Sequence, residues 1–233
     1  MLSLDFGSVL QGRYLDWLLA GAAKTVMLFG AAWLAGFLLS FVIVSLRQSK
    51  VRALEALAYA FVEFHRNVPG LVQVFIWYFG VPQLLPEAWQ AWINNQGSEF
   101  ILVWIALSLN TAAYMSEDLR SGIRSLPPTQ IEAARALGMN FVQSMRLIIL
   151  PQALRVAIPP LVNQSLGLFK STSLAMSVGL AEMTYAARQV ENETFRTFEA
   201  FAVASAFYWI CSFAIMGLGY LWMRKLNAGR SAR

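Results

Sequence analysis

The sequence contains one cysteine and one histidine among its 233 residues. A lone cysteine has no partner for an intrachain disulfide, and Cys211 lies inside an apolar run, where a small buried side chain fits well. Zinc sites take three or four cysteine, histidine or carboxylate ligands, so Cys211 and His65 do not make one. The sequence therefore predicts neither a disulfide framework nor a metal site.

Charged residues are also scarce, at 13% of the chain against 58% hydrophobic residues. A typical soluble domain carries about 25% charged residues, and the smaller share here cannot cover the surface of a soluble fold. Uncharged runs at residues 25–46, 67–86 and 200–223 are each long enough to cross a hydrocarbon core of about 30 Å. The composition predicts an all-α integral membrane protein.

Two further signatures are missing. The sequence has no Gly-rich phosphate loop of the GxxxxGKS/T type, so we expect no ATP site and no catalytic residues in this chain. The first 16 residues contain Asp5 and Asp16 and lack a basic leader before an apolar run, which predicts no cleavable signal. The first span is therefore expected to remain in the protein.

Basic residues gather at the ends of the apolar segments. Residues 81–99 have none, whereas 11 of the 18 form three groups: Arg47, Lys50, Arg52; Arg120, Arg124, Arg135, Arg146; and Arg224, Lys225, Arg230, Arg233. Cytoplasmic loops carry an excess of Lys and Arg, which places residues 120–146 and the C-terminus in the cytoplasm, and residues 81–99 and the N-terminus outside. Because the basic residues flank spans, the net charge of +5 does not indicate nucleic-acid binding.

We expect a single transmembrane domain over residues 1–233 with about five transmembrane helices, of which the second and fourth spans are broken. The predicted spans are residues 14–46, 51–81 with a break at Pro69 and Gly70, 100–115, 145–169 interrupted by Pro151, Pro159 and Pro160, and 200–223. Residues 170–199 are expected to include an external loop, with residues 173–180 able to dip back into the membrane as a re-entrant segment. A break inside the bilayer needs a protein-lined cavity, because hydrocarbon cannot satisfy the freed backbone groups.

A short polar segment between two apolar ones carries a spaced motif. Glu132, Ala133 and Ala134 are followed after three residues by Gly138 and after nine more by Ile148, with Leu150 and Pro151 completing the pattern. This spacing resembles, at every position, the EAA signature of the membrane subunits of binding-protein-dependent ABC importers. Residues 63–73 and 150–174 resemble the polar amino-acid branch of that family, and the similarity extends from about Trp17 to Lys225.

The resemblance implies a function and a set of partners. It implies a permease subunit that translocates a polar amino acid, of the histidine, glutamine or glutamate/aspartate type with glutamate/aspartate favoured, across the bacterial cytoplasmic (inner) membrane. ATP and magnesium would be bound by separate ABC ATPase subunits. A second copy or a homologous permease would complete the pathway within the lipid bilayer, and a periplasmic solute-binding protein would deliver substrate. The N-terminus would be periplasmic and the C-terminus cytoplasmic.

The resemblance also implies that the EAA segment is a cytoplasmic coupling helix that docks on the ATPase. Thr129 can cap its start, Glu132 offers a polar anchor, Ala133 and Ala134 keep one face slim, and Gly138 allows a close exit turn. The alternative is that Glu132 merely complements the helix dipole and Gly138 is an ordinary C-terminal cap. The complete spacing favours the coupling role.

The break after residue 67 is the first candidate for the substrate pathway. An amino acid carries a carboxylate and an ammonium, and Arg66, Glu63 and Asn67 offer complementary groups beside a helix start near the midplane. Charge within a membrane is costly, so a functional or paired role is expected. The alternative is an internal ion pair between Glu63 and Arg66, three residues apart on one helical face, that touches no substrate.

The second candidate set lies at the end of the fourth span: Asn163, Gln164, Lys170, Thr172 and Ser173. Lys170 can attract a carboxylate, and the polar side chains can line a path. The alternative is a solvated loop cap. Glu182, Arg188, Glu191 and Glu193 follow in the external region, where they could dock a binding protein or simply form a wet loop of mixed charge.

The sequence leaves two alternatives to an ABC permease subunit. An ion-gradient-driven transporter or channel that works without ATP would also have broken helices and buried charge, but it leaves the EAA spacing unexplained. A membrane anchor for another enzyme would need no substrate pathway, and Arg66 and Pro69 within the bilayer argue against it.

Overall fold

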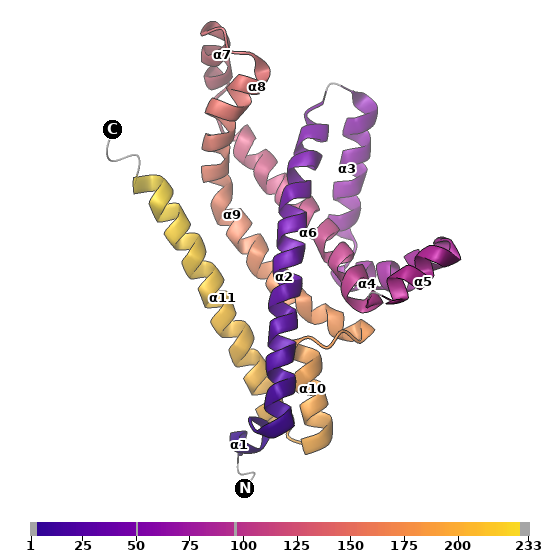
Figure 1. Ribbon diagram of the computed structural model, residues 1–233. Coiled ribbons are helices and arrows are strands. Elements are labelled where there is room, and N and C mark those ends of the chain that lie inside the picture. Colours follow the sequence, from indigo (N-terminus) through magenta and orange to yellow (C-terminus); the bar gives the residue numbers. More distant parts are fainter. Residues whose placement is uncertain (1–3, 50, 96, 229–233) are drawn as a thin grey trace.

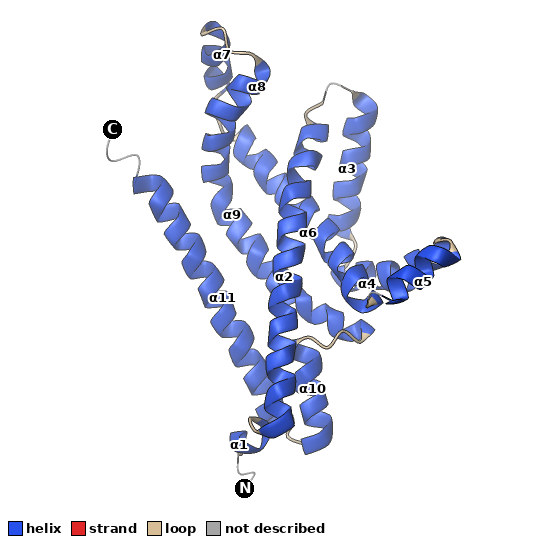
Figure 2. Cartoon of the chain, viewed as in Figure 1, coloured by secondary structure: helices blue, strands red, loops and turns tan. Residues whose placement is uncertain are grey.

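The computed structural model describes residues 4–49, 51–95 and 97–228. Side-chain positions are described as far as Lys225. Every regular element in these ranges is a helix (Figure 2). The α-helices are α1 (Phe6–Val9), α2 (Gly12–Arg47), α3 (Arg52–Asn67), α4 (Gly70–Phe75), α5 (Glu87–Asn95), α6 (Ser98–Arg124), α7 (Pro128–Ala136), α8 (Phe141–Ser144), α9 (Leu150–Ser171), α10 (Met183–Thr194) and α11 (Thr197–Ala228). Four short segments have other helical geometries. Two are π-helices, η1 (Ile76–Gly80) and η3 (Met145–Ile149), and two are 3-10 helices, η2 (Val81–Leu84) and η4 (Thr172–Val178).

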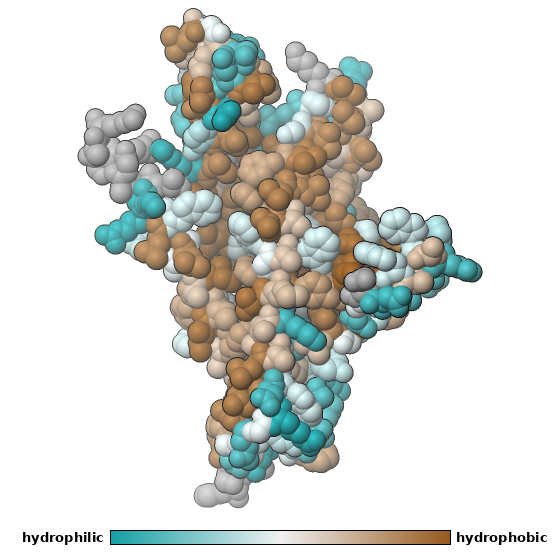
Figure 3. Space-filling view, in the orientation of Figure 1, coloured by the Kyte–Doolittle hydropathy of each residue, from teal (hydrophilic) through white to brown (hydrophobic). Residues whose placement is uncertain are grey.

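The all-α membrane architecture expected from the composition is confirmed. Four described helical segments are long and apolar enough to span a membrane: Gly12–Arg47, Ser98–Arg124, Phe141–Val178 and Thr197–Lys225. The shorter apolar helix Gly70–Leu84 follows α3 after a break, in the place of the second predicted span. Apolar side chains cover the middle of the molecule, while polar ones gather at its two ends (Figure 3).

The centre of the fold is the pair α2 and α6, which pack closely along their lengths (Figure 1). Small residues allow this approach, since a Cβ added to Gly36 would stand 2.9 Å from Thr111 and 3.0 Å from the Ser108 carbonyl oxygen. A glycine also allows α6 and α9 to approach closely, because a Cβ at Gly122 would lie 2.6 Å from the carbonyl oxygen of Ala153. Lipid-embedded helices associate through such close backbone contacts, since lipid tails remove the hydrophobic driving force.

The fourth span differs in detail from its sequence-based prediction. Helix α9 runs without interruption through Pro159 and Pro160, and its departures from α geometry lie in the turns at either end, η3 and η4. Contacts with α6 and α11 hold this helix on both sides. Helix-breaking residues are tolerated inside a membrane helix where neighbouring helices support the weakened turn.

The third span extends further than predicted, to Arg124 instead of residue 115. One of the two acidic side chains on this extension is paired, because Glu117 accepts from Arg47 of α2 at 2.8 Å and lies 3.2 Å from Arg120, while Asp118 forms no ion pair among the described residues. The paired charges let the helix continue past the residues expected to end it.

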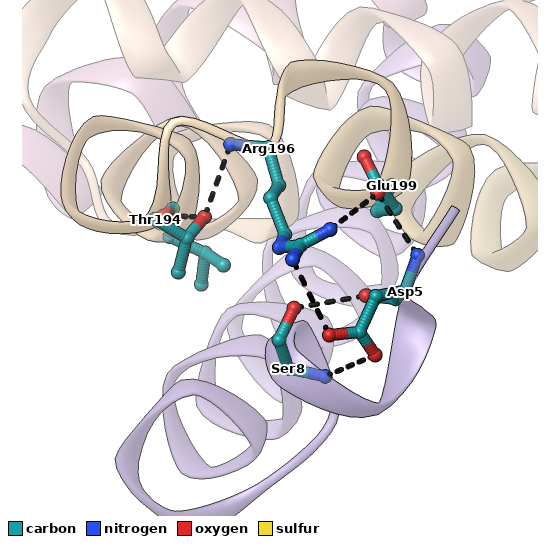
Figure 4. Close-up of polar contacts among 6 residues, drawn as sticks. Asp5, Ser8, Thr194, Arg196 and Glu199 are labelled. Carbon is teal, nitrogen blue, oxygen red and sulfur yellow. Dashed lines mark hydrogen bonds and ion pairs between the residues drawn. The ribbon is translucent and has the colours of Figure 1, made fainter. Parts of the chain in front are cut away.

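The N-terminal end of the molecule is a polar knob made by α1, α10, the first turns of α2 and the start of α11 (Figure 1). Its apolar interior includes Val9, Leu18 and Val190. Figure 4 shows how α1 is fixed there: Arg196 lies 3.3 Å from the Asp5 carboxylate and 3.1 Å from that of Glu199. The knob lies at the opposite end of the fold from α7.

Candidate coupling and translocation sites

Helix α7 holds the EAA motif and lies at the far tip of the molecule (Figure 1). Its N-cap is Pro127 and its first residue is Pro128, so the expectation that Thr129 caps the helix is wrong. Proline suits the first helical position, because its fixed φ is already helical and its missing N–H would have had no partner. The two prolines therefore place Thr129 inside the first turn.

The motif residues on α7 divide between two environments. Glu132 and Ala133 are exposed, whereas Ala134 is completely buried against the neighbouring turns. Contacts with α8 and η3 hold the buried side. The helix therefore presents the Glu132 carboxylate and the small side chain of Ala133 on its outward face at the edge of the fold.

Gly138 ends α7 in a two-bond C-terminal turn. The N–H of Gly138 donates to the carbonyl oxygen of Arg135 at 2.9 Å, and that of Met139 donates to Ala134 at 3.1 Å. This pattern needs a left-handed residue, and Gly138 has a φ of +74°. Asn140 then begins α8 with a reciprocal capping box formed with Gln143. Both ends of this turn are fixed by hydrogen bonds, so α7 is rigidly joined to the start of the fourth span.

At the break in the second span, side chains donate hydrogen bonds to backbone carbonyl groups that have lost their helical partners. Pro69 has no N–H, so the carbonyl oxygen of His65, four residues earlier, loses its helical partner. Side chains replace it: the Gln73 amide donates to His65 at 2.8 Å, and the Asn110 amide donates at 2.9 Å. The hydroxyl of Tyr114 likewise donates to the carbonyl oxygen of Arg66 at 3.2 Å.

Sequence reasoning missed Gln73, Asn110 and Tyr114 as parts of this site. Gln73 is buried, with 2% of its surface exposed, and its amide also donates to the Val68 carbonyl oxygen at 2.8 Å. An isolated glutamine in an apolar run was the available signal, since a buried amide needs partners. Asn110 and Tyr114 come from α6 and could be assigned only from the packing.

The charged residues at the break do not pair with each other. Glu63 accepts from the side-chain amide of Asn67 at 3.0 Å, and no ion pair joins it to Arg66 in the described structure. Arg66 is exposed, and its guanidinium carbon lies 5.6 Å from the centre of the Tyr114 ring. The internal ion pair considered from the sequence is therefore absent, and a cation remains accessible beside the break.

The second candidate set lies where α9 tightens into η4. Lys170 and Asn163 are exposed and Gln164 is half-buried, while the hydroxyls of Thr172 and Ser173 each donate to a carbonyl three residues back at 2.7 Å. These two hydroxyls thus cap the helix end.

The structure brings the two helix breaks together. Helix α4 contacts η4, and a Cβ added to Gly70 would stand 3.4 Å from a methyl carbon of Leu174. Among the described side chains no hydrogen bond or ion pair connects Arg66 with Lys170. The two cations therefore mark adjoining segments of the fold without forming one closed site in a single chain.

Glu182 does not form part of an external docking surface, because it is completely buried. It caps α10 by accepting from the backbone N–H groups of Thr184 and Tyr185, and it accepts from the Tyr208 hydroxyl of α11 at 2.8 Å. Burial raises the pKa of this carboxyl, an effect that the hydrogen bonds partly offset. Its role is to join α10 and α11.

The other external charges are partly engaged. Glu193 pairs with Arg13 of α2, and Glu191 accepts from the hydroxyl of Thr197 at 3.2 Å. Arg188 is exposed. The outer knob therefore keeps a surface of mixed charge, although Glu182 does not contribute to it.

The fold is that of an all-α membrane protein with a break in its second predicted span and a short exposed helix, α7, at one end. The chain belongs to the family of binding-protein-dependent transport system inner membrane components, whose model matches residues 34–227. It is similar to the nopaline transport system permease protein NocM of Agrobacterium fabrum, with 39% identity over 93% of this chain and 90% of that protein. It is also similar to the glutamate/aspartate import permease protein GltJ of Escherichia coli K12, with 34% identity over 92% of this chain and 89% of that protein.

Solved structures agree with this family. A crystal structure of an amino acid ABC transporter with histidines matches 96% of this chain and 100% of its own, with a TM-score of 0.83 and 29% identity. An inward-facing structure of the MetNI methionine ABC transporter shares the fold, with a TM-score of 0.70 and 14% identity over 93% of this chain and 99% of that one.

Proposed function

We propose that this chain is the permease subunit of an ABC importer for a polar amino acid, with its described helices forming one transmembrane domain. The observation that carries the proposal is α7: an exposed Glu132 on a helix at the tip of the fold, closed by a left-handed Gly138 at the spacing of the EAA signature. Relatives named as amino-acid permeases, together with an amino acid ABC transporter structure, support the substrate class.

In this proposal α7 transmits movement from the ATPase to the spanning helices. The turn at Gly138 and the capping box at Asn140 tie α7 to the start of the fourth span. A push on the Glu132 face would therefore move α7 and α9 together instead of bending the connection. Closure of the ATPase cleft on ATP binding would rotate the helices as rigid bodies. The ATPase subunits would bind ATP and magnesium, and this chain would catalyse no reaction.

The broken second span would supply the substrate path. Arg66 is exposed beside the break and can attract a substrate carboxylate, while Glu63 and Asn67 can receive the ammonium group. Lys170, with Asn163 and Gln164 on the preceding turns of α9, would contribute from the second break, whose hydroxyl groups at Thr172 and Ser173 hold the turn. Binding near the midplane between rocking halves is typical of alternating access.

The remaining partners follow from the two ends of the molecule. The end bearing α7 and the C-terminal end of α11 would face the cytoplasm, and the knob bearing the N-terminus would face the periplasm and receive a binding protein. A second copy or a homologous permease would enclose the pathway. Two ATPase subunits would dock on the paired α7 helices.

Glutamate or aspartate is the substrate that we favour. The cations Arg66 and Lys170 are attractive to an acidic side chain, although every amino acid also has an α-carboxylate. Similar relatives are named for nopaline as well as for glutamate/aspartate, so uptake assays with competing amino acids must decide.

The proposal is tested by copurification of a tagged chain in mild detergent followed by mass spectrometry. We expect stoichiometric recovery of an ATPase subunit, lost in Glu132→Arg and Gly138→Arg. Glu55→Arg is the matched control, because Glu55 is also exposed but lies on α3. A lone chain that supports gradient-driven uptake after reconstitution would overturn the proposal in favour of an ATP-independent transporter.

A further inference from the structure

A wedge opens on one side of the molecule where α11 diverges from α2 and α9 toward its C-terminal end (Figure 1). Side chains leave two adjoining grooves in this wedge, of about 240 Å³ and about 290 Å³. They meet at Trp222, which lines both. Helices α9 and α11 approach closely beside the first of these grooves, since a Cβ at Gly219 would stand 2.5 Å from Val162.

The first groove, which we name the apolar groove, is lined by aromatic and aliphatic side chains of three helices: Phe29, Trp33 and Phe37 of α2, Leu161, Val162 and Ser165 of α9, and Ile215, Leu218, Gly219 and Trp222 of α11. Its polar groups already have partners, because the indole N–H of Trp33 donates to the Ser165 hydroxyl at 2.7 Å, and that hydroxyl donates to the Leu161 carbonyl oxygen at 2.7 Å. Such a surface suits a hydrocarbon chain and offers no hydrogen bond to a polar solute.

The second groove, which we name the basic groove, contains Arg146 and Arg155 beside Leu150, Leu154 and Trp222. Both arginines are exposed, and neither forms an ion pair or donates a hydrogen bond within the described residues. The groove's lining includes no acidic side chain. A planar guanidinium matches the geometry of a phosphate, so two unpaired arginines create a site for an anion.

In the orientation proposed above, the basic groove lies toward the cytoplasmic ends of the spans. Arg146 also borders a neighbouring cavity with Gln48 and Ser49, directly after the uncharged run that ends at Leu46. Trp222 lies two residues before Arg224, near the end of the uncharged run of α11. Tryptophan and basic residues both favour the membrane–water interface. The cations therefore lie where a lipid headgroup would be, and the apolar groove lies where its acyl chain would be.

We propose that the wedge binds an anionic phospholipid of the inner leaflet, with an acyl chain in the apolar groove and the phosphate held by Arg146 and Arg155. Charge complementarity selects this occupant, because an apolar channel that ends at two unpaired cations matches an anionic lipid at both ends. Basic pockets between spanning helices on the cytoplasmic side are typical of anionic-lipid recognition. This inference goes beyond the proposed transport function and does not depend on the substrate.

A lipid in the wedge would bridge helices that otherwise diverge. A ligand that binds the folded protein but not the unfolded chain raises its stability by mass action. The bound lipid is therefore expected to hold the end of α11 against α9. Phosphatidylglycerol should raise the melting temperature of the purified complex more than phosphatidylcholine does.

The test measures lipids retained by the full complex in mild detergent, by native mass spectrometry, with phosphatidylglycerol and phosphatidylcholine added in turn. We expect phosphatidylglycerol to be retained preferentially, and Arg146→Gln and Arg155→Gln each to weaken its retention about fivefold. Arg124→Gln is the matched control, because Arg124 is an exposed arginine at the end of α6 outside both grooves. The control should retain the lipid like the parent.

Ile215→Trp provides a second variant that fills the apolar groove without changing charge, and it should also reduce retention. Equal retention of both lipids, or equal loss in Arg124→Gln, would overturn the proposal. Inorganic phosphate that stabilises the complex as well as the lipid does would assign the cations to a free anion instead. A disulfide between two copies of Trp222→Cys would show that a second permease fills the wedge, which also contradicts the lipid site.

Discussion

The side-chain amide of Asn110 on α6 donates a hydrogen bond of 2.9 Å to the backbone carbonyl oxygen of His65 on α3. That carbonyl faces Pro69, which cannot donate to it. The contact therefore shows how the fold satisfies a backbone group that the break leaves without its helical partner. A side chain on another helix replaces the missing backbone N–H, and the break is held open at a fixed place.

We predict that Asn110→Leu lowers the stability of the purified complex by about 1 kcal/mol, and that Gln73→Leu lowers it by about 1–3 kcal/mol. Gln73 has the larger effect because its buried amide serves both His65 and Val68. Gln83→Leu is the control, since the exposed amide of Gln83 serves only the Phe79 carbonyl of its own turn. Thermal unfolding in detergent measures the changes, and an equal loss in the control would contradict this role.

Arg66→Ala is expected to weaken uptake while the subunits still assemble. The guanidinium is exposed at the break and takes part in no ion pair within the described structure, so its removal breaks no ion pair, although it takes a favourable charge away from the half-buried Asp118. We expect at least a tenfold rise in the KM for transport, because one carboxylate contact is lost. Unchanged uptake kinetics in proteoliposomes would count against a substrate role.

The turn at Gly138 after α7, the proposed coupling helix, gives a graded prediction. Gly138→Ala should cost about 1–2 kcal/mol, because an alanine at a φ of +74° is strained even though a Cβ there would meet no neighbour within 4 Å. Gly138→Asn should be milder, since asparagine tolerates the left-handed region. The ratio of transport to ATP hydrolysis should fall more in the alanine variant. The same ratio for both would show that backbone strain at this turn is not what matters.

The packing of α2 on α6 can be tested with two glycines of the same helix. Gly36→Ala should destabilise the protein by about 1–3 kcal/mol, because its Cβ would stand 2.9 Å from Thr111. Gly30→Ala is the matched control, and it should be neutral or stabilising by up to about 1 kcal/mol, since nothing lies within 4 Å of the added carbon. Equal melting temperatures for both variants would contradict a tight α2–α6 contact.

The buried carboxyl of Glu182 should make the free energy of unfolding of this protein depend on pH. Burial raises its pKa in the folded state above the ordinary value of 4.5, so the folded protein binds the proton more tightly than the unfolded chain does. The stability from this carboxyl is greatest below 4.5 and is lost as the pH rises through the raised pKa. Glu182→Gln should flatten this decline in melting temperature, at a cost of about 1 kcal/mol for the weakened cap. An unchanged slope would assign the decline to another group.

Several expectations from the sequence hold in the structure because they rest on short-range chemistry. The break at Pro69 and the turn at Gly138 follow from backbone groups that the residue itself lacks or frees. The turn from α6 to α7 falls at Pro127 and Pro128 for the same reason. The expected cap at Thr129 failed because the rigid prolines begin the helix earlier than a hydroxyl would.

Other expectations failed because burial cannot be read from a local sequence. Glu182 was grouped with an external charged surface, yet it is completely buried between α10 and α11. The third span was expected to end before Glu117, whereas Arg47 from a distant helix neutralises that charge and the helix continues. In both residues the decisive partner lies far away in the chain.

The amino-acid sequence by itself determined the membrane class, the approximate places of the spans, the basic residues at the ends of the apolar segments and the spacing of the EAA motif. These features depend on composition and on the backbone chemistry of neighbouring residues. Only the tertiary structure decided which side chains satisfy the broken span, which glutamate is buried, and where two unpaired arginines meet an apolar groove. The reason is physical: burial and hydrogen bonding depend on helices that pack together from distant parts of the chain.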